Sequence, residues 1–291
     1  MTPAVAATLV REASALFAAA GIDAPERDAE VLLAHVLGID RGALHARPDR
    51  PMEGDAVRRY RELVRRRAAR EPIQHLTGQQ EFWSLPFRVT PDVLIPRPET
   101  EGILEALLER ALPVEPGRPR LLDLGTGSGC LAIAAARALP GARVTAVDDS
   151  EAALEVARSN AEALGVSDRV AFALGDLYAA LPSGTSDGPF DAILSNPPYV
   201  AVADLDGLAP EVRDHEPRRA LTPGADALAV HRRILQGAPR VLAAGGWLLV
   251  EIGAGQEAAV RALYATQEAI RLEEIRPDLA GLPRVVVARA A

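Results

Sequence analysis

Short apolar runs alternate with amphipathic helical stretches from residue 121 to the end of the chain, and this alternation constrains the fold more than any other feature. The runs of strand length are Leu121–Leu124, Arg143–Val147, Val170–Leu174, Asp191–Ser195, Trp247–Ile252 and Arg284–Ala288. Strands that are joined through helices lie parallel, with right-handed crossovers. The pattern therefore predicts an α/β fold with a mostly parallel sheet.

The N-terminal part has a different pattern. Apolar residues recur at helical spacing, and Gly21 and Gly38 stand where helices would end, which predicts a small helical bundle over residues 1–74. Residues 75–98 are rich in β-branched and aromatic residues broken by prolines, which predicts a β-hairpin connector. A helix restarts after Pro98, so we expect the α/β domain to cover residues 99–291.

The balance of charge bears on possible partners. The chain has 32 basic and 40 acidic residues, a formal net charge of −8. A protein that coats nucleic acid usually has a basic balance. Residues 57–70 are locally rich in arginine, which is compatible with a solvated helix face or with a docking surface for an acidic or RNA-containing partner.

Cysteine and hydropathy indicate the compartment. Cys130 is the single cysteine, and Arg11 and Glu12 interrupt any apolar N-terminal run, so we expect a cytoplasmic protein. No apolar stretch approaches the ~20 residues that span a bilayer, and we expect no membrane insertion. The five histidines show no metal-ligand spacing, and we assign no metal.

A glycine-rich turn links the strand at 121–124 to the next helix. It reads Asp123-Leu124-Gly125-Thr126-Gly127-Ser128-Gly129. Glycines let the backbone approach a ligand closely, and the helix that follows offers free N–H groups. Cys130 stands where a dinucleotide fingerprint requires its third glycine, which weakens an NAD interpretation.

Acidic residues accompany the turn. Asp148 ends the second strand, where a carboxylate can accept hydrogen bonds from both hydroxyls of a ribose. Asp123 is expected either near the cationic amino-acid part of the same ligand or bonded to the loop. Asp176 is either a neighbour of the adenine or a solvated acid. Together these features resemble the S-adenosylmethionine site of class I methyltransferases, which have a Rossmann-like fold.

The sequence Asn196-Pro197-Pro198-Tyr199 follows the strand at 191–195 and is the most specific signal in the chain. An amide or aromatic amine is a poor nucleophile because its lone pair is delocalised. The Asn196 oxygen and a prolyl carbonyl can accept two N–H bonds and support the positive charge that develops on the nitrogen. Tyr199 can stack on a flat acceptor. The motif is similar to that of the amino-methyltransferases, which act on adenine, cytosine or glutamine nitrogens.

Further segments narrow the resemblance. They are QQEFWSLPF (79–87), LIPRPETE (94–101), LDLGTGSG (122–129), HEPRRAL (215–221) and DLAGLPRVVVAR (278–289). With the N-terminal helices, they resemble the HemK/PrmC-type glutamine methyltransferases of peptide-chain release factors over essentially the whole chain. In that family the substrate is the glutamine of the GGQ motif, which is methylated on its side-chain amide nitrogen in support of translation termination.

The resemblance implies roles for individual residues. By position, Gly125, Thr126, Gly127, Ser128, Gly129 and Asp148 hold S-adenosylmethionine, and Asn196, Pro197, Pro198 and Tyr199 hold the glutamine. Leu177 occupies a cofactor-contact position that is Trp in some relatives, and Asn196 borders both ligands. Arg97 and Glu99 are expected beside the active site, where an Arg fork suits a carboxylate, or in a salt bridge that closes the connector on the catalytic domain.

We therefore expect the helical bundle to recognise a class 1, GGQ-containing release factor, and we expect a monomer with no direct nucleic-acid substrate. Two alternatives remain open. A nucleic-acid adenine amino-methyltransferase would use the same acceptor motif on a flipped base. A catalytically silent scaffold would bind partners through the arginine-rich helix and leave the Asn-Pro-Pro-Tyr motif unexplained.

Overall fold

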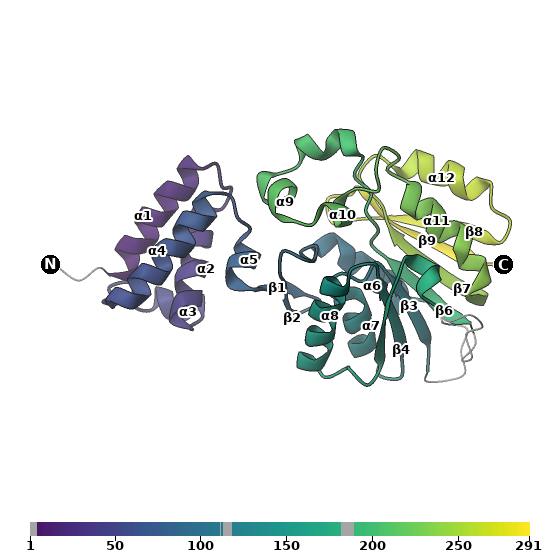
Figure 1. The fold of residues 1–291 in the computed structure, drawn as a ribbon, viewed down its shortest axis with the longest axis horizontal. Helices are drawn as coiled ribbons and strands as arrows, with labels where there is room; N and C mark the ends of the chain where they lie inside the picture. Colours follow the sequence, from purple (N-terminus) through teal and green to yellow (C-terminus); the bar gives the residue numbers. More distant parts are fainter. Residues whose placement is uncertain (1–4, 111, 113–117, 182–188) are drawn as a thin grey trace. The chain divides into compact units, whose positions relative to one another are not determined.

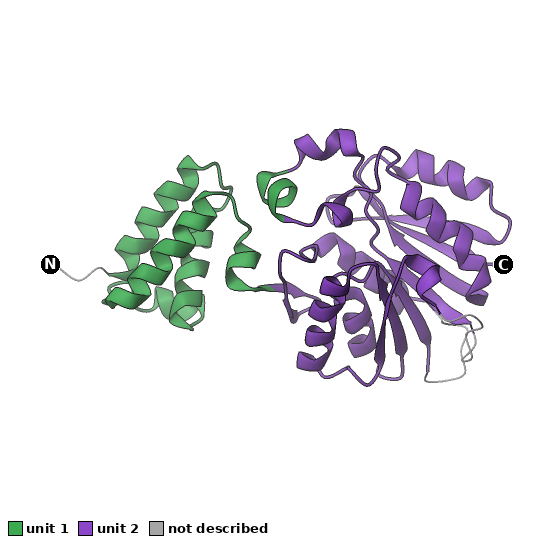
Figure 2. Ribbon diagram, viewed as in Figure 1, with its two compact units in different colours: residues 1–79, 209–215 green, residues 80–208, 216–291 purple. Residues whose placement is uncertain are grey.

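A computed structural model describes residues 5–110, 112, 118–181 and 189–291. The chain divides into two compact units, shown in Figure 2. The first, called the helical unit, comprises residues 1–79 and 209–215. The second, called the α/β unit, comprises residues 80–208 and 216–291. A short segment far along the chain thus belongs with the N-terminal helices.

Six helices make up the described part of the helical unit. They are α1 (Ala6–Ala19), α2 (Pro25–Leu37), α3 (Arg41–His45), α4 (Gly54–Ala68), α5 (Ile73–Thr77) and α9 (Pro210–His215) (Figure 1). Pro25 occupies the first turn of α2, and Gly38 ends that helix with a φ of +65°. The core includes the fully buried Phe17, Leu33 and Tyr60, and the Tyr60 hydroxyl donates to the carbonyl of Ala29 at 3.0 Å.

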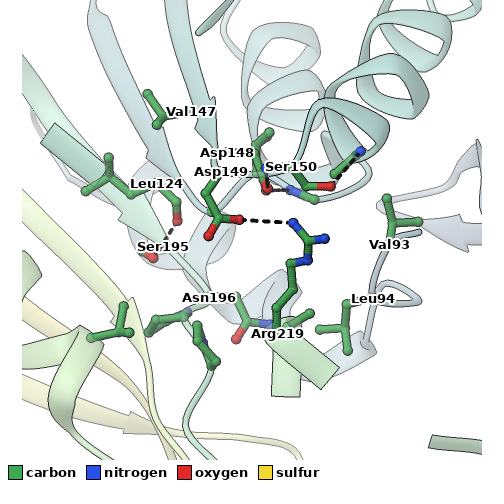
Figure 3. A pocket seen from close by; sticks show the side chains of 18 of the residues that line it. Val93, Leu94, Leu124, Val147, Asp148, Asp149, Ser150, Ser195, Asn196 and Arg219 are labelled. Atoms are coloured by element: carbon green, nitrogen blue, oxygen red, sulfur yellow. Dashed lines mark hydrogen bonds and ion pairs between the residues drawn. The ribbon is translucent and has the colours of Figure 1, made fainter. Parts of the chain in front are cut away.

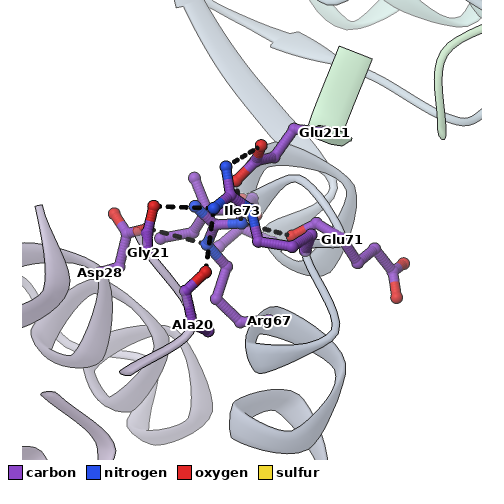
Figure 4. A network of polar contacts seen from close by, with 9 residues as sticks. Ala20, Gly21, Asp28, Arg67, Glu71, Ile73 and Glu211 are labelled. Atoms are coloured by element: carbon purple, nitrogen blue, oxygen red, sulfur yellow. Dashed lines mark hydrogen bonds and ion pairs between the residues drawn. The ribbon is translucent and has the colours of Figure 1, made fainter. Parts of the chain in front are cut away.

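A buried ionic network holds the segment 209–215 in the helical unit (Figure 4). Arg67, whose side chain is only 8% exposed, donates from Nε to Asp28 at 2.8 Å and from Nη1 to Glu211 at 2.9 Å. Arg70 donates from Nη2 to the other Glu211 oxygen at 2.6 Å. Both carboxylate oxygens of Glu211 are therefore bonded to guanidinium groups, which makes this residue the anchor of the segment.

We expect Glu211→Ala to destabilise the helical unit by about 1.5–3 kcal/mol, the range for lost hydrogen bonds to charged groups. Backbone amides of residues 209–215 should then exchange hydrogen faster, because the segment loses its anchor. Hydrogen exchange followed by mass spectrometry measures both effects. Glu62→Ala is the control, since Glu62 forms an exposed pair with Arg65 on α4. Equal exchange rates for residues 209–215 in the two variants would contradict the anchoring role.

The other arginines of α4 are largely paired with acidic residues of the same unit. Arg58 and Arg59 contact Asp55, Arg65 contacts Glu62, and Arg66 contacts Glu71. These neighbouring carboxylates compensate the positive charge that the sequence shows. The structure thus favours the solvated helix face over a docking surface for an acidic partner.

A seven-stranded sheet forms the centre of the α/β unit, in the order β5-β4-β3-β6-β7-β9-β8. The strands are β3 (Arg120–Leu124), β4 (Arg143–Asp148), β5 (Val170–Leu174), β6 (Phe190–Ser195), β7 (Leu242–Glu251), β8 (Ile270–Pro277) and β9 (Pro283–Ala290). The strands from β5 to β7 are parallel, and β9 is antiparallel to both of its neighbours. A separate hairpin is formed by β1 (Gln79–Phe82) and β2 (Leu85–Arg88).

Helices cover both faces of this sheet (Figure 1). On one face, α6 (Glu101–Leu108), α7 (Cys130–Ala138) and α8 (Glu151–Ala163) contribute to one hydrophobic cluster. On the other, α11 (Ala229–Gly237) and α12 (Glu257–Ala265) contribute to a second. The shorter helical elements are η1 (Pro98–Thr100), η2 (Leu177–Ala180), η3 (Val202–Gly207), α10 (Arg218–Leu221) and η4 (Ala238–Arg240).

The predicted fold class is confirmed: an N-terminal helical part, a β-hairpin and a mostly parallel sheet of the class I methyltransferase type. Strand β8 was not predicted from the sequence. A bulge between Leu272 and Glu274 breaks its alternation, and it carries charged side chains as an edge strand. No helix in the described ranges has both the length and the hydropathy needed to cross a bilayer.

Candidate active site

A cavity of about 370 Å³ opens at the carboxyl ends of β3, β4 and β6 (Figure 3). Ligands bind at this edge in open α/β sheets. The residues singled out in the sequence that line it are Arg97, Gly125, Thr126, Gly127, Ser128, Asp148, Asp176, Leu177, Asn196, Pro197 and Pro198. The glycine turn and the Asn196-Pro197-Pro198 part of the acceptor motif, about seventy residues apart in sequence, therefore face one space.

The glycine turn is shaped to hold a ligand closely. Gly125 and Gly127 have φ angles of +76° and +55°, and apart from the adjacent residues no described atom lies within 4 Å of the position that a Cβ would occupy. Gly129 has a different role, because a Cβ there would lie 2.9 Å from Ile133 and 3.1 Å from Ala157 of α8. The first two glycines thus leave a cradle open to the cavity, and Gly129 lets α7 and α8 pack together.

Asp148 presents a carboxylate to the cavity from the end of β4. Its Oδ2 accepts from the Gly127 N–H at 2.9 Å and its Oδ1 from the Ser150 N–H at 3.0 Å. Burial raises the pKa of this carboxyl above its ordinary value. Each oxygen can still accept another hydrogen bond, so the group fits a pair of neighbouring hydroxyls.

Asp123 is fully buried below the turn and is not part of the cavity wall. Its Oδ2 accepts from the Thr126 hydroxyl at 2.6 Å and from the Ala132 N–H at 3.2 Å, and Oδ1 has no partner among the described residues. Of the two alternatives for this residue, the geometry favours a bond to the loop. Burial raises the pKa of Asp123 from 3.8 to about 7.

This raised pKa predicts a pH dependence of stability. A carboxyl with a raised folded-state pKa stabilises the folded state fully below the unfolded value, and that contribution is lost as the pH rises from about 4 to about 7. Asp123→Asn removes the titration, so its free energy of unfolding relative to wild type should increase across this window. Chemical denaturation of both proteins without cofactor measures it. A difference that stays constant between these pH values would contradict the expectation.

Asp176 and Leu177 line the cavity where the chain leaves β5. Leu177 has a positive φ of +50°, uncommon for this residue type. Asp176 accepts from Arg233 Nη2 at 2.7 Å, and both side chains are more than half exposed. Asp176 is thus a solvated acid at the edge of the cavity, and its contact with an adenine stays a prediction.

Asn196 follows directly after β6, whose last residue is fixed by a bond from the Ser195 hydroxyl to the Leu124 carbonyl at 2.6 Å. The Asn196 Nδ2 donates to the Thr100 Oγ1 at 3.0 Å. This leaves the oxygen Oδ1 as the end of the amide that can accept from a ligand. Pro197 and Pro198 continue the same wall.

Glu99 and Tyr199 are not part of the cavity wall. Glu99 is exposed in η1. The Tyr199 hydroxyl donates to Glu251 Oε1 at 3.1 Å, and burial raises the pKa of this phenol above its ordinary value. The stacking of Tyr199 on an acceptor stays a prediction, but its hydroxyl already has a partner in the protein.

Arg97 lines the cavity and also forms an ion pair with the buried Glu216, whose other oxygen accepts from the Ile95 N–H at 3.2 Å. Of the two alternatives predicted for Arg97, the structure therefore favours the salt bridge within the protein. Cys130 also lines the cavity, and burial raises the pKa of its thiol to about 12, which disfavours the thiolate that a nucleophile would need.

Sequence reasoning missed three groups beside these residues. Arg219 reaches across the cavity to within 3.7 Å of Asp149 (Figure 3). Thr100 lies under Asn196, and Glu251 at the end of β7 bonds both Thr100 and Tyr199. The sequence does contain one signal for Glu251, because an acidic residue directly follows the apolar run of β7.

Comparisons with known proteins agree with this architecture. Residues 8–78 match the PrmC N-terminal domain, and residues 118–278 match a methyltransferase domain. Among solved structures, a methyltransferase from Pyrococcus furiosus is similar with a TM-score of 0.51 and 20% identity, covering 70% of this chain and 88% of that one. A human methyltransferase 10 domain containing protein is similar with a TM-score of 0.53 and 17% identity, covering 72% of this chain and 89% of that one. The fold is that of a class I methyltransferase.

Sequence relatives give the family. A release factor glutamine methyltransferase from Cereibacter sphaeroides is 45% identical over 98% of this chain and 98% of its own length. Those from Moorella thermoacetica and Deinococcus radiodurans are 45% and 44% identical, covering 95% and 97% of this chain and 95% and 98% of their own lengths. The chain belongs to the family of release factor glutamine methyltransferases.

Proposed function

We propose that this enzyme transfers a methyl group from S-adenosyl-L-methionine to the side-chain amide nitrogen of the GGQ glutamine in class 1 release factors, in support of translation termination. The observation that carries the proposal is that the glycine turn and the first three residues of the Asn-Pro-Pro-Tyr motif line one cavity in a chain of this family. The first suits a nucleoside cofactor, and the second suits a planar amide.

The cofactor part of the cavity is formed by Gly125, Gly127 and Asp148, with Asp176 and Leu177 at its edge. The open cradle beside the glycines and the spare acceptor capacity of Asp148 fit a nucleoside with two ribose hydroxyls. When bound, S-adenosylmethionine supplies a methyl group activated by a sulfonium. The residues of the turn hold and orient it, which contributes to the rate through positioning.

The acceptor part of the cavity is formed by Asn196, Pro197 and Pro198. Asn196 Oδ1 and the Pro197 carbonyl accept the two N–H bonds of the glutamine amide and orient its nitrogen for in-line displacement. These acceptors bind more strongly as positive charge develops on that nitrogen, so they stabilise the transition state over the ground state. No covalent enzyme intermediate is needed.

We also propose that the N-terminal helices recognise the release factor. Deleting residues 1–70 should leave cofactor affinity intact and sharply reduce methylation of an intact release factor, since the cavity wall contains none of these residues. The deletion also removes Arg67 and Arg70, the partners of Glu211, so full-length Glu211→Ala is the control. Calorimetry measures cofactor affinity, and methylation assays measure activity, for the wild type, the truncated enzyme and Glu211→Ala. Full activity of the truncated enzyme would refute the recognition role.

A substrate panel tests the acceptor class. Labelled S-adenosylmethionine is offered with a release factor, the same factor lacking the GGQ glutamine, and adenine-containing DNA or RNA. We expect label only in the unaltered release factor. Label in nucleic acid would favour the adenine alternative, for which the charge balance of −8 and the paired arginines of α4 give no support.

A further inference from the structure

A buried chain of hydrogen bonds runs from Glu251 to the acceptor motif. The Thr100 hydroxyl donates to Glu251 Oε2 at 2.6 Å, and the Thr100 Oγ1 itself accepts from Asn196 Nδ2 at 3.0 Å. Thr100 and Glu251 are 2% and 1% exposed. At that burial, solvent does not replace the bonds, so the three side chains behave as one unit.

The donor-to-acceptor direction of these hydrogen bonds determines which end of the Asn196 amide faces the cavity. Glu251 accepts on both oxygens, from the Thr100 hydroxyl and from the Tyr199 hydroxyl, so the Thr100 proton points to Glu251. Burial raises the pKa of the Glu251 carboxyl, and these two hydrogen bonds oppose that shift. The Thr100 oxygen then offers a lone pair, which only the NH₂ end of Asn196 can use. If the amide turned over, its oxygen would meet the oxygen of Thr100 with no proton between them.

Glu251 also braces the far end of the motif. Its second oxygen accepts from the Tyr199 hydroxyl at 3.1 Å. The Tyr199 carbonyl in turn accepts from Gln256 Nε2 at 2.8 Å, and Gln256 Oε1 accepts from the Gly253 N–H at 2.8 Å. One buried carboxylate is thus connected to the first and the last residue of the Asn-Pro-Pro-Tyr motif.

We propose that Thr100 and Glu251 are positioning residues, which hold Asn196 with its oxygen toward the substrate amide. The inference rests on the proposed function of Asn196 as the acceptor of the amide N–H. Thr100 and Glu251 act only through Asn196 and Tyr199. Their contribution should therefore appear in the rate of methyl transfer and depend on the presence of Asn196.

Thr100→Val and Thr100→Ser distinguish the contribution of the Thr100 hydroxyl from that of the packing of its side chain. Valine keeps the shape and lacks the hydroxyl, so we expect kcat to fall about 10-fold to 100-fold, the equivalent of one hydrogen bond to a charged group. Cofactor affinity by calorimetry should change little. Serine restores the hydroxyl and should recover most of the rate. Thr266→Val is the control, because the exposed Thr266 hydroxyl donates to the Leu263 carbonyl and is not part of the cavity wall.

A double-mutant cycle tests the route through Asn196. Because Asn196→Ala removes the group that Thr100 orients, Thr100→Val should cost less than about twofold in that background. An equal loss in both backgrounds would overturn the positioning role, and so would a wild-type kcat for Thr100→Val when Asn196→Ala is impaired. A wild-type rate for Asn196→Ala would instead refute the proposed function of that residue.

Glu251→Gln gives a second route if Thr100→Val does not fold. The Tyr199 hydroxyl needs an acceptor, which directs the Gln oxygen to Tyr199 and its NH₂ group to Thr100. The Thr100 proton then points to Asn196 and favours the inverted amide. We expect kcat to fall by about the same 10-fold to 100-fold, and an unchanged kcat would overturn the inference.

Discussion

Asn196→Ala should lower kcat for release factor methylation by ~10²–10³-fold, by analogy with the loss of one oxyanion-hole donor. Asn196 Oδ1 is the end of the amide left for the substrate, since Nδ2 is bonded to Thr100. An acceptor that strengthens as the amide nitrogen becomes positive stabilises the transition state more than bound substrate. The loss should therefore fall mainly on kcat and less on KM.

Single-turnover methylation with saturating cofactor measures this rate without product release. Calorimetric titration of the variant shows how far cofactor binding is altered, since Asn196 borders both parts of the cavity. A near wild-type single-turnover rate in a folded variant would refute the amide-clamp mechanism, even though the family membership would stand.

Asp148→Ala should weaken S-adenosylmethionine binding at least ~10-fold, because two ribose hydroxyls lose an acceptor and each such bond to a charged group contributes about 1.5–3 kcal/mol. The substitution also leaves the Gly127 and Ser150 N–H groups without their partner, so the turn itself loses support. Both effects act in the same direction on affinity.

Calorimetric titration of the folded variant measures the dissociation constant. Glu155→Ala is the control for the loss of one negative charge, because Glu155 is exposed on α8 and is not part of the cavity wall. Unchanged affinity in Asp148→Ala would remove this residue from the cofactor site.

The central strands could be predicted from the sequence because each is a short apolar run bounded by glycine or by a charged residue. The glycine turn and the Asn-Pro-Pro-Tyr motif could also be found, because the residues that form each of them are consecutive in the sequence. Strand β8 could not, because its bulge and the charges of an edge strand remove the alternation.

Groups that act through tertiary contacts leave no local pattern. Glu211 joins the helical unit through arginines 141 and 144 positions earlier, and nothing around residue 211 indicates it. Thr100 and Asn196 are 96 positions apart, and Glu251 is a further 55 beyond Asn196 (251 − 196). Only the fold brings these side chains to one place, so the positioning network was absent from the sequence prediction.

Mass spectrometry of a release factor after incubation with the enzyme and isotope-labelled S-adenosylmethionine shows directly whether the GGQ glutamine is the methyl acceptor. We expect one labelled methyl group on the GGQ peptide, located by fragmentation on the glutamine side chain, and none when that glutamine is replaced by asparagine. A labelled methyl group on another residue, or an unmodified release factor in the presence of cofactor-bound enzyme, would contradict this expectation.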